Sequence, residues 1–457
     1  MKKIDVLLIN SPSPNAGSIL SHRIQGLPPL GLGYIATVLQ ENGYVCKILD
    51  FYLKDVSMKD LIAILEEGQP SVIGISTTTE TYQSGIRIAE RVKALAGDTP
   101  VLMGGPHVTF EYEAALRSGV VDIVTRGEGE ITTLELCNAL IRNEGSLSEI
   151  AGIVYLRDGQ IVRNKDRAMI CDLDSLPLVD RSLFDIEKYS VPSSISTSRG
   201  CPGRCIFCAA SGLSGGKYRM RSPESIVKEF EYLKSLGFKK VQIIDDTMTA
   251  SIRRLNAILD LLLEKKLDMI WACESRVDVV TKELLEKMYR AGCRSLQFGV
   301  EAGNQEMLDC LKKNITLEQI RNAFRWCNEL GISSASCLII GQPFDTKETI
   351  EQTVRLGIEL QELGAQIVFS ISTPYPGTYM YDHTDEFDLE IIDEDFDDYT
   401  TQHAVYNSKH LSAEEIQNYF FDACLSVGRV KINENILNKY KMIRDEALLN
   451  SKQAQNA

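Results

Sequence analysis

The chain has 457 residues, of which 44% are hydrophobic and 25% are charged, a composition typical of globular proteins and unlike that of disordered or collagen-like chains. Its net charge of −14 and pI of about 5.1 argue against bulk nucleic-acid binding, which usually needs a basic surface. No apolar run reaches the ~18 residues of a membrane span, and the N-terminus makes a poor secretory signal, so a cytoplasmic protein is expected.

Residues 1–145 alternate predicted strands and helices. The apolar run 4–9 ends in Asn10-Ser11-Pro12, the pattern of a buried parallel strand that enters a loop. Further strands are predicted at 45–49, 72–76, 101–103 and 123–124, and helices at 32–42, 82–95 and from about 130 to 143. This order predicts an α/β domain with a doubly wound, flavodoxin- or Rossmann-like parallel sheet, which binds its ligand at the carboxyl ends of the strands.

Residues 146–190 have a different pattern, which indicates a linker. Asp158-Gly159 lies between two short apolar runs and predicts a β-hairpin, and Pro177 and Pro192 mark the connection that follows.

A second series of strands and helices occupies residues 191–385. The predicted strands are 194–197, 240–244, 269–273, 295–300, 335–340 and 366–372. The predicted helices between them are 223–236, 251–265, 281–291, 316–330 and 346–361. Six βα units in series predict a partial (βα)6 barrel of the TIM type, with its working face at the carboxyl ends of the strands.

Residues 386–457 form a small helical extension in this scheme. The acidic stretch 385–398 is expected to be a solvated surface loop. Ser412 and Glu415 form a predicted capping box for a helix that runs to about Arg429, and a polar tail follows.

Three of the 12 cysteines are closely spaced. Cys201, Cys205 and Cys208 form a C-x3-C-x2-C pattern directly after a predicted strand, in a loop rich in glycine and proline. A zinc site would need a fourth ligand nearby, but the next cysteine is Cys273 and no histidine occurs between His107 and His383. Three thiolates without a fourth fit a 4Fe-4S cluster with one iron left open. The other nine cysteines have no paired metal spacing, so a second cluster is not predicted.

The cysteine pattern resembles the signature of the radical S-adenosylmethionine (SAM) superfamily. The resemblance implies that SAM chelates the open iron and is cleaved by one electron to a 5′-deoxyadenosyl radical. It extends to barrel segments that line the SAM site in that family. The SAM-binding residues that it implies are Phe207, Asp245, Asp246, Arg276, Glu301 and Gly341. For Arg276 and Glu301 an ordinary ion pair is the alternative interpretation.

The N-terminal domain allows three interpretations. Gly31-Leu32-Gly33-Tyr34-Ile35-Ala36 matches the dinucleotide pattern G-x-G-x-x-A, but about twenty residues separate it from the first strand, whereas nicotinamide or flavin binding needs the glycines immediately after that strand. The second interpretation is a cobalamin-binding domain, because the loop segments of residues 1–145 resemble those of cobalamin-binding domains that are fused to radical SAM barrels. The third is a vestigial domain that binds nothing or packs against a partner.

The resemblance implies that loop residues at the carboxyl ends of the strands bind cobalamin. They are Ser11, Pro12, Leu30, Gly31, Ser76, Thr77, Thr78, Gly104, Gly105, His107, Gly127 and Glu128. The D-x-H-x-x-G motif that supplies a histidine to cobalt in other cobalamin domains is absent, since His22 has no aspartate two residues before it. His107 could contact the corrin or the nucleotide tail, or be a loop histidine bonded to the backbone.

The two resemblances together imply a cobalamin-dependent radical SAM enzyme that methylates an unactivated carbon of a small molecule, lipid or peptide. An oxidative cyclase or rearrangement enzyme is the alternative within the family, and a non-catalytic iron–sulfur or redox-sensing protein is the alternative outside it. An electron donor such as flavodoxin or ferredoxin is the implied protein partner. No single residue is identified as catalytic, and the substrate is not identified.

Overall fold

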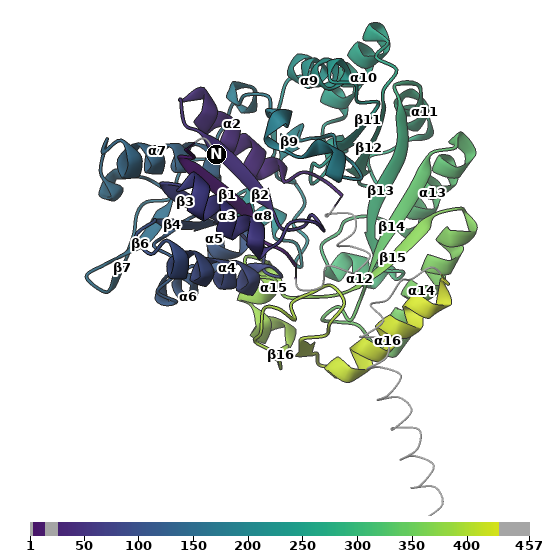
Figure 1. Ribbon diagram of the computed structural model, residues 1–457. Coiled ribbons are helices and arrows are strands. Elements are labelled where there is room, and N and C mark those ends of the chain that lie inside the picture. The colour runs from purple at the N-terminus through teal and green to yellow at the C-terminus, as the bar shows by residue number, and fades with distance from the viewer. Residues whose placement is uncertain (1–2, 14–25, 429–457) are drawn as a thin grey trace, which may run out of the picture.

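The computed structural model describes residues 3–13 and 26–428, which form two βα systems lying side by side (Figure 1). His22 and the tail beyond 428, including Arg429, lie outside the described residues.

The first system is a sheet with the strand order β2-β1-β3-β4-β5-β6-β7, in which β1 to β5 are parallel. Its elements, in chain order, are β1 (Val6–Asn10), α2 (Leu30–Glu41), β2 (Cys46–Asp50), α3 (Met58–Gly68), β3 (Val72–Ser76), α4 (Tyr82–Leu95), β4 (Val101–Gly104), α5 (Pro106–Phe110), α6 (Glu113–Arg117), β5 (Ile123–Thr125), α7 (Gly129–Ile141), β6 (Ile153–Arg157) and β7 (Gln160–Arg163).

Strand β1 shows why this sheet is covered on both faces. Val6 and Leu8 point to one face and pack with α2 and α7, whereas Leu7 and Ile9 point to the other and pack with α3 and α4. A strand with apolar residues on both sides needs helices on both sides, so the predicted doubly wound sheet is confirmed.

The predicted hairpin at Asp158-Gly159 is present, but it is not a detached part of the linker. Its first strand, β6, pairs antiparallel with the edge strand β5, and β7 pairs with β6. The hairpin therefore extends the N-terminal sheet and satisfies the backbone groups that the edge of β5 would otherwise leave unpaired. Three 3-10 turns follow, at Leu173–Ser175, Arg181–Leu183 and Ile186–Lys188.

The second system is an open parallel sheet with the order β15-β14-β13-β12-β11-β8, which confirms the partial barrel. Its strands are β8 (Ser194–Ile195), β11 (Lys240–Ile243), β12 (Ile270–Ser275), β13 (Cys293–Glu301), β14 (Ser333–Ile340) and β15 (Gln366–Ile371). Its helices are α8 (Ala210–Leu213), α9 (Pro223–Ser235), α10 (Ile252–Lys265), α11 (Lys282–Arg290), α12 (Gln305–Cys310), α13 (Leu317–Leu330), α14 (Lys347–Glu362) and α15 (Tyr379–Asp382). In Figure 1 the long helices of this system run along the outer side of the sheet, away from the N-terminal domain.

Two short antiparallel pairs interrupt this series, although the sequence predicts no antiparallel strands there. β9 (Ser198–Arg199) pairs with β10 (Arg219–Met220) across the loop that carries the three cysteines. β16 (Glu390–Ile391) pairs with β17 (Tyr406–Asn407) in the C-terminal extension. Pairs of two residues are too short to produce an apolar pattern in the sequence.

The extension ends, within the described residues, in α16 (Ala413–Ser426), which begins at the predicted capping box of Ser412 and Glu415. Helix α16 packs on the barrel through Ile416, which lies against Gly341. No helix in the described ranges is both long enough and apolar enough to cross a membrane.

Candidate functional site

A cavity of about 360 Å³ lies at the carboxyl ends of the N-terminal strands, between this domain and the barrel. Ser196, Arg199 and Ile244 of the barrel form one wall, and the N-terminal loops form the rest. The predicted cobalamin-binding residues that line the cavity are Leu30, Gly31, Ser76, Gly104, Gly105, Gly127 and Glu128. Those that do not line it are Ser11, Pro12, Thr77, Thr78 and His107.

Glycines give this cavity its shape in two ways. A Cβ at Gly31 or at Gly127 would meet no atom within 4 Å, so both backbones face open space. A Cβ at Gly105, where φ is +110°, would overlap the carbonyl oxygen of Thr77. The first two glycines thus leave room for a large flat ligand, and the third lets neighbouring loops touch. Such a cradle fits cobalamin.

The glycine pair that imitates a dinucleotide motif has another role. A Cβ at Gly33 would overlap the side chains of Val179 and Phe184 in the linker. Gly33 is therefore needed for the linker to pack against α2, and not for a pyrophosphate.

His107 is buried outside the cavity. Its Nδ1 lies 3.3 Å from the Thr79 hydroxyl, and its Nε2 has no hydrogen-bond partner. Its ring contacts Tyr82 and Phe396, with centroids 4.2 and 4.6 Å away. Burial lowers the pKa of His107 to about 4, so the ring is neutral near pH 7. Phe396, a residue of the C-terminal extension, thus helps to bury the His107 ring.

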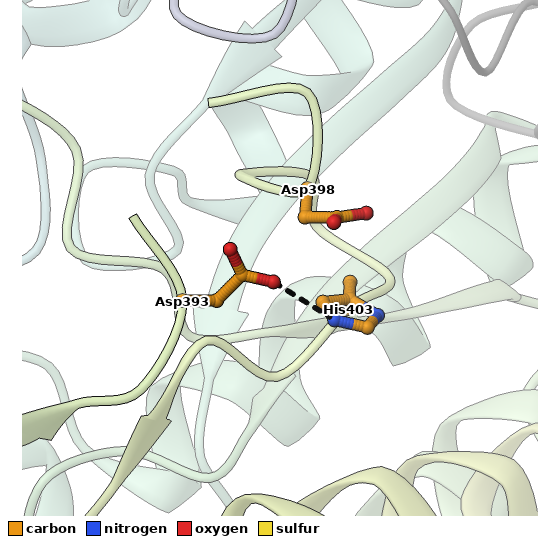
Figure 2. A group of neighbouring side chains, drawn as sticks. All are labelled: Asp393, Asp398 and His403. Atoms are coloured by element: carbon orange, nitrogen blue, oxygen red, sulfur yellow. Dashed lines mark ion pairs between the residues drawn. The ribbon is translucent and has the colours of Figure 1, made fainter. Parts of the chain in front are cut away.

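The loop around Phe396 also contains three potential metal-ligating side chains. Figure 2 shows Asp393, Asp398 and His403 turned toward one another, and His403 Nε2 lies 3.8 Å from Asp393 Oδ2. Partial burial raises the pKa of Asp398, and the electrostatic interaction with His403 offsets part of this rise. Most acidic side chains of the stretch are exposed, as the sequence suggests, namely Asp385, Glu386, Asp388, Glu390, Glu394 and Asp395. The stretch is nevertheless anchored at one end, because Phe396 and Asp397 contact the N-terminal domain, the latter through Arg87 at 3.1 Å.

The three predicted cluster cysteines are free thiols in the loop between β9 and α8. The Gly203 N–H donates to Cys201 Sγ at 3.4 Å, and the Cys208 N–H donates to the Cys205 carbonyl at 3.2 Å, so the loop folds around its own sulfurs. Within residues 3–13 and 26–428, the only three His, Cys, Asp or Glu ligand atoms within 4.8 Å of one another belong to Asp393, Asp398 and His403. The cysteine sulfurs are spread more widely, as suits ligands to different irons of one cluster and not to a single zinc ion.

Burial raises the pKa of Cys208 to about 11 and also raises that of Cys205. Iron bound by these thiols would therefore have to displace their protons. Five of the other cysteines are buried, namely Cys137, Cys273, Cys293, Cys327 and Cys424.

The two aspartates after β11 hold the segment before the cluster loop. Asp245 is buried and accepts hydrogen bonds from Thr197 N and Ser198 Oγ, both at 2.6 Å. Asp246 accepts a hydrogen bond from Gly200 N at 3.0 Å and lines a second cavity of about 300 Å³. Asp245 thus fixes the backbone, while Asp246 faces the space beside the cluster loop.

Glu301 and Arg276 take part in ion pairs next to the cluster loop. Glu301 Oε1 lies 2.7 Å from the Nζ of Lys313, and both side chains are buried. Arg276 pairs with Asp278 at 2.9 Å and donates to the Lys313 carbonyl at 2.8 Å. Gly203 of the cluster loop lies beside the Arg276 guanidinium. Both residues therefore form the ion pairs of the alternative interpretation, and they do so at the place where SAM contacts are expected.

Lys313 is a residue that sequence reasoning missed. Two consecutive lysines at 312 and 313 indicate solvent-exposed cations, yet Lys313 is only 8% exposed. The sequence feature that could have indicated this close packing is Gly299, because a Cβ there would lie 2.8 Å from Lys313 Nζ. A glycine in the middle of a strand often marks such a close approach.

Phe207 and Gly341 pack within the barrel. Phe207 is partly buried against the barrel core. Gly341 has φ +73°, its carbonyl accepts a hydrogen bond from Tyr406 Oη, and a Cβ there would overlap Ile416. The glycine therefore lets α16 approach the barrel closely.

Family models and relatives agree with this geometry. A radical SAM superfamily model matches residues 195–357, and a B12 binding domain model matches residues 19–137. An uncharacterized methyltransferase of Pyrococcus horikoshii is 32% identical over 434 residues, which are 93% of each chain. An anaerobic magnesium-protoporphyrin IX monomethyl ester cyclase of Rubrivivax gelatinosus is 28% identical over 383 residues, 79% of this chain and 68% of the cyclase.

A solved structure shares the fold of both systems. It is that of TsrM, a radical SAM methyltransferase from Kitasatospora setae with cobalamin and a [4Fe-4S] cluster bound. It has a TM-score of 0.69 and 19% identity and covers 86% of this chain and 78% of TsrM. The B12 model covers the domain with the glycine-lined cavity, which favours the cobalamin interpretation over the dinucleotide and vestigial ones. Since the P. horikoshii relative is similar along nearly the whole chain and both models match, this chain belongs to the cobalamin-binding radical SAM family, whose cofactors are a 4Fe-4S cluster, SAM and cobalamin.

Proposed function

We propose that this protein is a C-methyltransferase that methylates an unactivated carbon of a small molecule, lipid or peptide. The observation that carries the proposal is that the two cavities share wall residues, among them Glu128, Arg199 and Ile244. One cavity is the glycine-lined cradle, and the other reaches Gly200 and Asp246 beside the cluster loop. A substrate in the shared space would lie between the two cofactor sites.

The chain's own residues bind and orient. Cys201, Cys205 and Cys208 would hold the cluster and leave one iron for SAM. When bound, the cofactors supply the radical and methyl-transfer chemistry that side chains cannot perform. Asp245 fixes the backbone that precedes the cysteines. Ile244, 41% exposed, presents an apolar side chain to both cavities and would help to exclude water there.

The SAM contacts are part of this proposal. Asp246, Arg276 and Glu301 surround the cluster loop with one polar group each, and Phe207 follows Cys205 on the loop itself. The buried hydroxyl of Thr247, next to Asp246, has no hydrogen-bond partner and is a further candidate to contact SAM. Gly341 would contribute through its backbone.

Isotope transfer tests the proposal. Anaerobically reconstituted protein is incubated with a chemical reductant, hydroxocobalamin and SAM labelled with deuterium in its methyl group. We expect 5′-deoxyadenosine and labelled methyl in the extracted corrinoid, and neither from the Cys205→Ala variant. If the protein retains its cluster but forms no 5′-deoxyadenosine, the interpretation as a radical enzyme is refuted. The alternative of a redox-sensing protein would then be favoured.

A second candidate is an oxidative cyclase or rearrangement enzyme. The similarity to the R. gelatinosus cyclase over 79% of this chain favours it. In that case 5′-deoxyadenosine forms but the deuterated methyl does not reach the corrinoid, so the same experiment separates the two reactions. Flavodoxin or ferredoxin is the proposed electron donor, and replacing the chemical reductant with reduced flavodoxin tests it.

A further inference from the structure

The strands β9 and β10 form a hairpin on either side of the cysteine loop. Two arginines of this hairpin form ion pairs with two glutamates in the wall of the glycine-lined cavity. Arg199 Nη1 lies 2.7 Å from Glu128 Oε1, and Arg199 Nη2 lies 2.5 Å from Glu130 Oε1. Arg219 Nη1 donates to both carboxylate oxygens of Glu128, at 2.8 and 2.9 Å. Arg199 and Arg219 face each other in the β9–β10 register, so the hairpin presents both guanidinium groups together. We call these four residues the clamp.

The clamp is shielded from solvent, so its ion pairs differ from ordinary surface pairs. The side chains of Arg199 and Glu128 are 20% and 16% exposed, and that of Glu130 is 5% exposed. Burial acts to raise the pKa of Glu128, but hydrogen bonds from Arg199, Ile170 N and Arg219 lower it overall. Charge-assisted hydrogen bonds in such surroundings are strong and fix geometry.

Each side of the clamp is continuous with a cofactor site. Arg199 lies two residues before Cys201, and the N–H of the intervening Gly200 is held by Asp246. Glu128 is the N-cap of α7 and Glu130 lies in the first turn of that helix, and both line the cavity together with Gly127 and Gly129. The arginine also lies over the ring of Tyr34, 5.4 Å from its centroid, on another wall of the cavity.

We propose that Arg199 is a positioning residue that joins the cluster loop to the cobalamin cavity, so that binding of either cofactor strengthens binding of the other. The inference rests on the proposed function, since it needs both cofactors in these sites. A bound cluster would order the cysteine loop and, with it, the β9–β10 hairpin. The clamp would then hold the turn before α7, which lines the cavity that cobalamin would occupy. By linkage, cobalamin strengthens cluster binding by the same factor.

The experiment measures hydroxocobalamin affinity by absorbance titration, with and without the cluster, in wild-type protein and three variants. We expect the cluster to tighten cobalamin binding in the wild type by at least about 5-fold, the lower end of typical couplings. In Arg199→Met the ratio falls toward one, because within the clamp only the Arg219 contact with Glu128 then joins the two sides, and Arg199→Lys recovers part of it, because a lysine keeps the charge but not the two-pronged geometry. Arg167→Met is the control variant, because the Arg167 side chain is 15% exposed, close to the 20% of Arg199, and pairs with Glu135 of α7 and not with a residue of the barrel.

Three results would overturn the inference: a wild-type ratio near one, an unchanged ratio in Arg199→Met, or an equal loss in Arg167→Met. Should Arg199→Met fail to fold, Glu130→Gln removes one of the two Arg199 ion pairs from the other side and should lower the ratio in the same direction. Failure of the proposed function has a different signature, since cluster-loaded wild-type protein would then bind no cobalamin or form no 5′-deoxyadenosine.

Discussion

Removing Lys313 is expected to destabilise the barrel strongly, because it leaves the Glu301 carboxylate buried without its cation. Nζ and Oε1 are 2.7 Å apart, and the two residues are 8% and 6% exposed, so the pair belongs to the buried class. Breaking a buried pair costs about 3–5 kcal/mol, whereas exposed pairs contribute about 0–1 kcal/mol. Lys313→Met should therefore lower the free energy of unfolding by about 3–5 kcal/mol.

A double-mutant cycle isolates the pair. Lys313→Met/Glu301→Gln removes both charges, so it should cost less than the sum of the single variants by at least about 2 kcal/mol. The assay is urea unfolding of cluster-free protein followed by tryptophan fluorescence. Both tryptophans of the chain lie in the barrel, Trp271 in β12 and Trp326 in α13, so the signal reports that domain. A loss below about 1 kcal/mol in Lys313→Met, or strict additivity, would show that the pair behaves as a solvated one.

Three further predictions concern the cofactor sites and the C-terminal loop. Gly31→Val places a side chain in open space, so it should weaken hydroxocobalamin binding at least about tenfold, equivalent to 1.4 kcal/mol, with little change in melting temperature; unchanged affinity would show that cobalamin does not occupy this wall. Phe396→Ala should raise the pKa of His107 from about 4 toward its ordinary value of about 6.5, because removing the ring reverses the burial that lowers it; histidine NMR titration would detect this, and a pKa still near 4 would mean that other groups bury the ring. Replacing Cys201, Cys205 or Cys208 by alanine should abolish the about four irons bound per chain, whereas Cys273→Ala, at a buried thiol, should retain them; equal iron loss in Cys273→Ala would contradict the three-ligand site.

The features that the sequence predicted are those that local patterns encode. Runs such as 72–76 are apolar on both faces, which only a strand covered on both sides explains, and β3 occupies those residues. The spacing of Cys201, Cys205 and Cys208 is equally local, since one short loop supplies all three sulfurs. The capping residues Ser412 and Glu415 predicted the beginning of α16 for the same reason.

The features that it missed depend on contacts between residues far apart in the chain. Phe396 reaches His107 from almost three hundred residues away in sequence, and nothing near either residue marks the contact. The hairpin 153–163 was recognised, but its pairing with β5 depends on which edge of the sheet is open. The sequence around Lys313 does not mark its burial, because the close approach of its Nζ to Gly299 involves another element.

The same distinction explains where this protein can control its chemistry. Cysteine spacing and glycine loops specify each cofactor site separately, and either site could exist without the other. The separation between them is set by contacts that cross the domain boundary, of which the Arg199 pairs with Glu128 and Glu130 lie closest in sequence to the cluster cysteines. Under the proposed function, a substrate radical generated beside the cluster must meet the methyl donor on the cobalamin side before it meets water, and reacting groups misplaced by about 1 Å can lose about a hundredfold in rate. Substitutions at this boundary should therefore change how efficiently SAM cleavage is coupled to product formation more than they change binding of either cofactor alone.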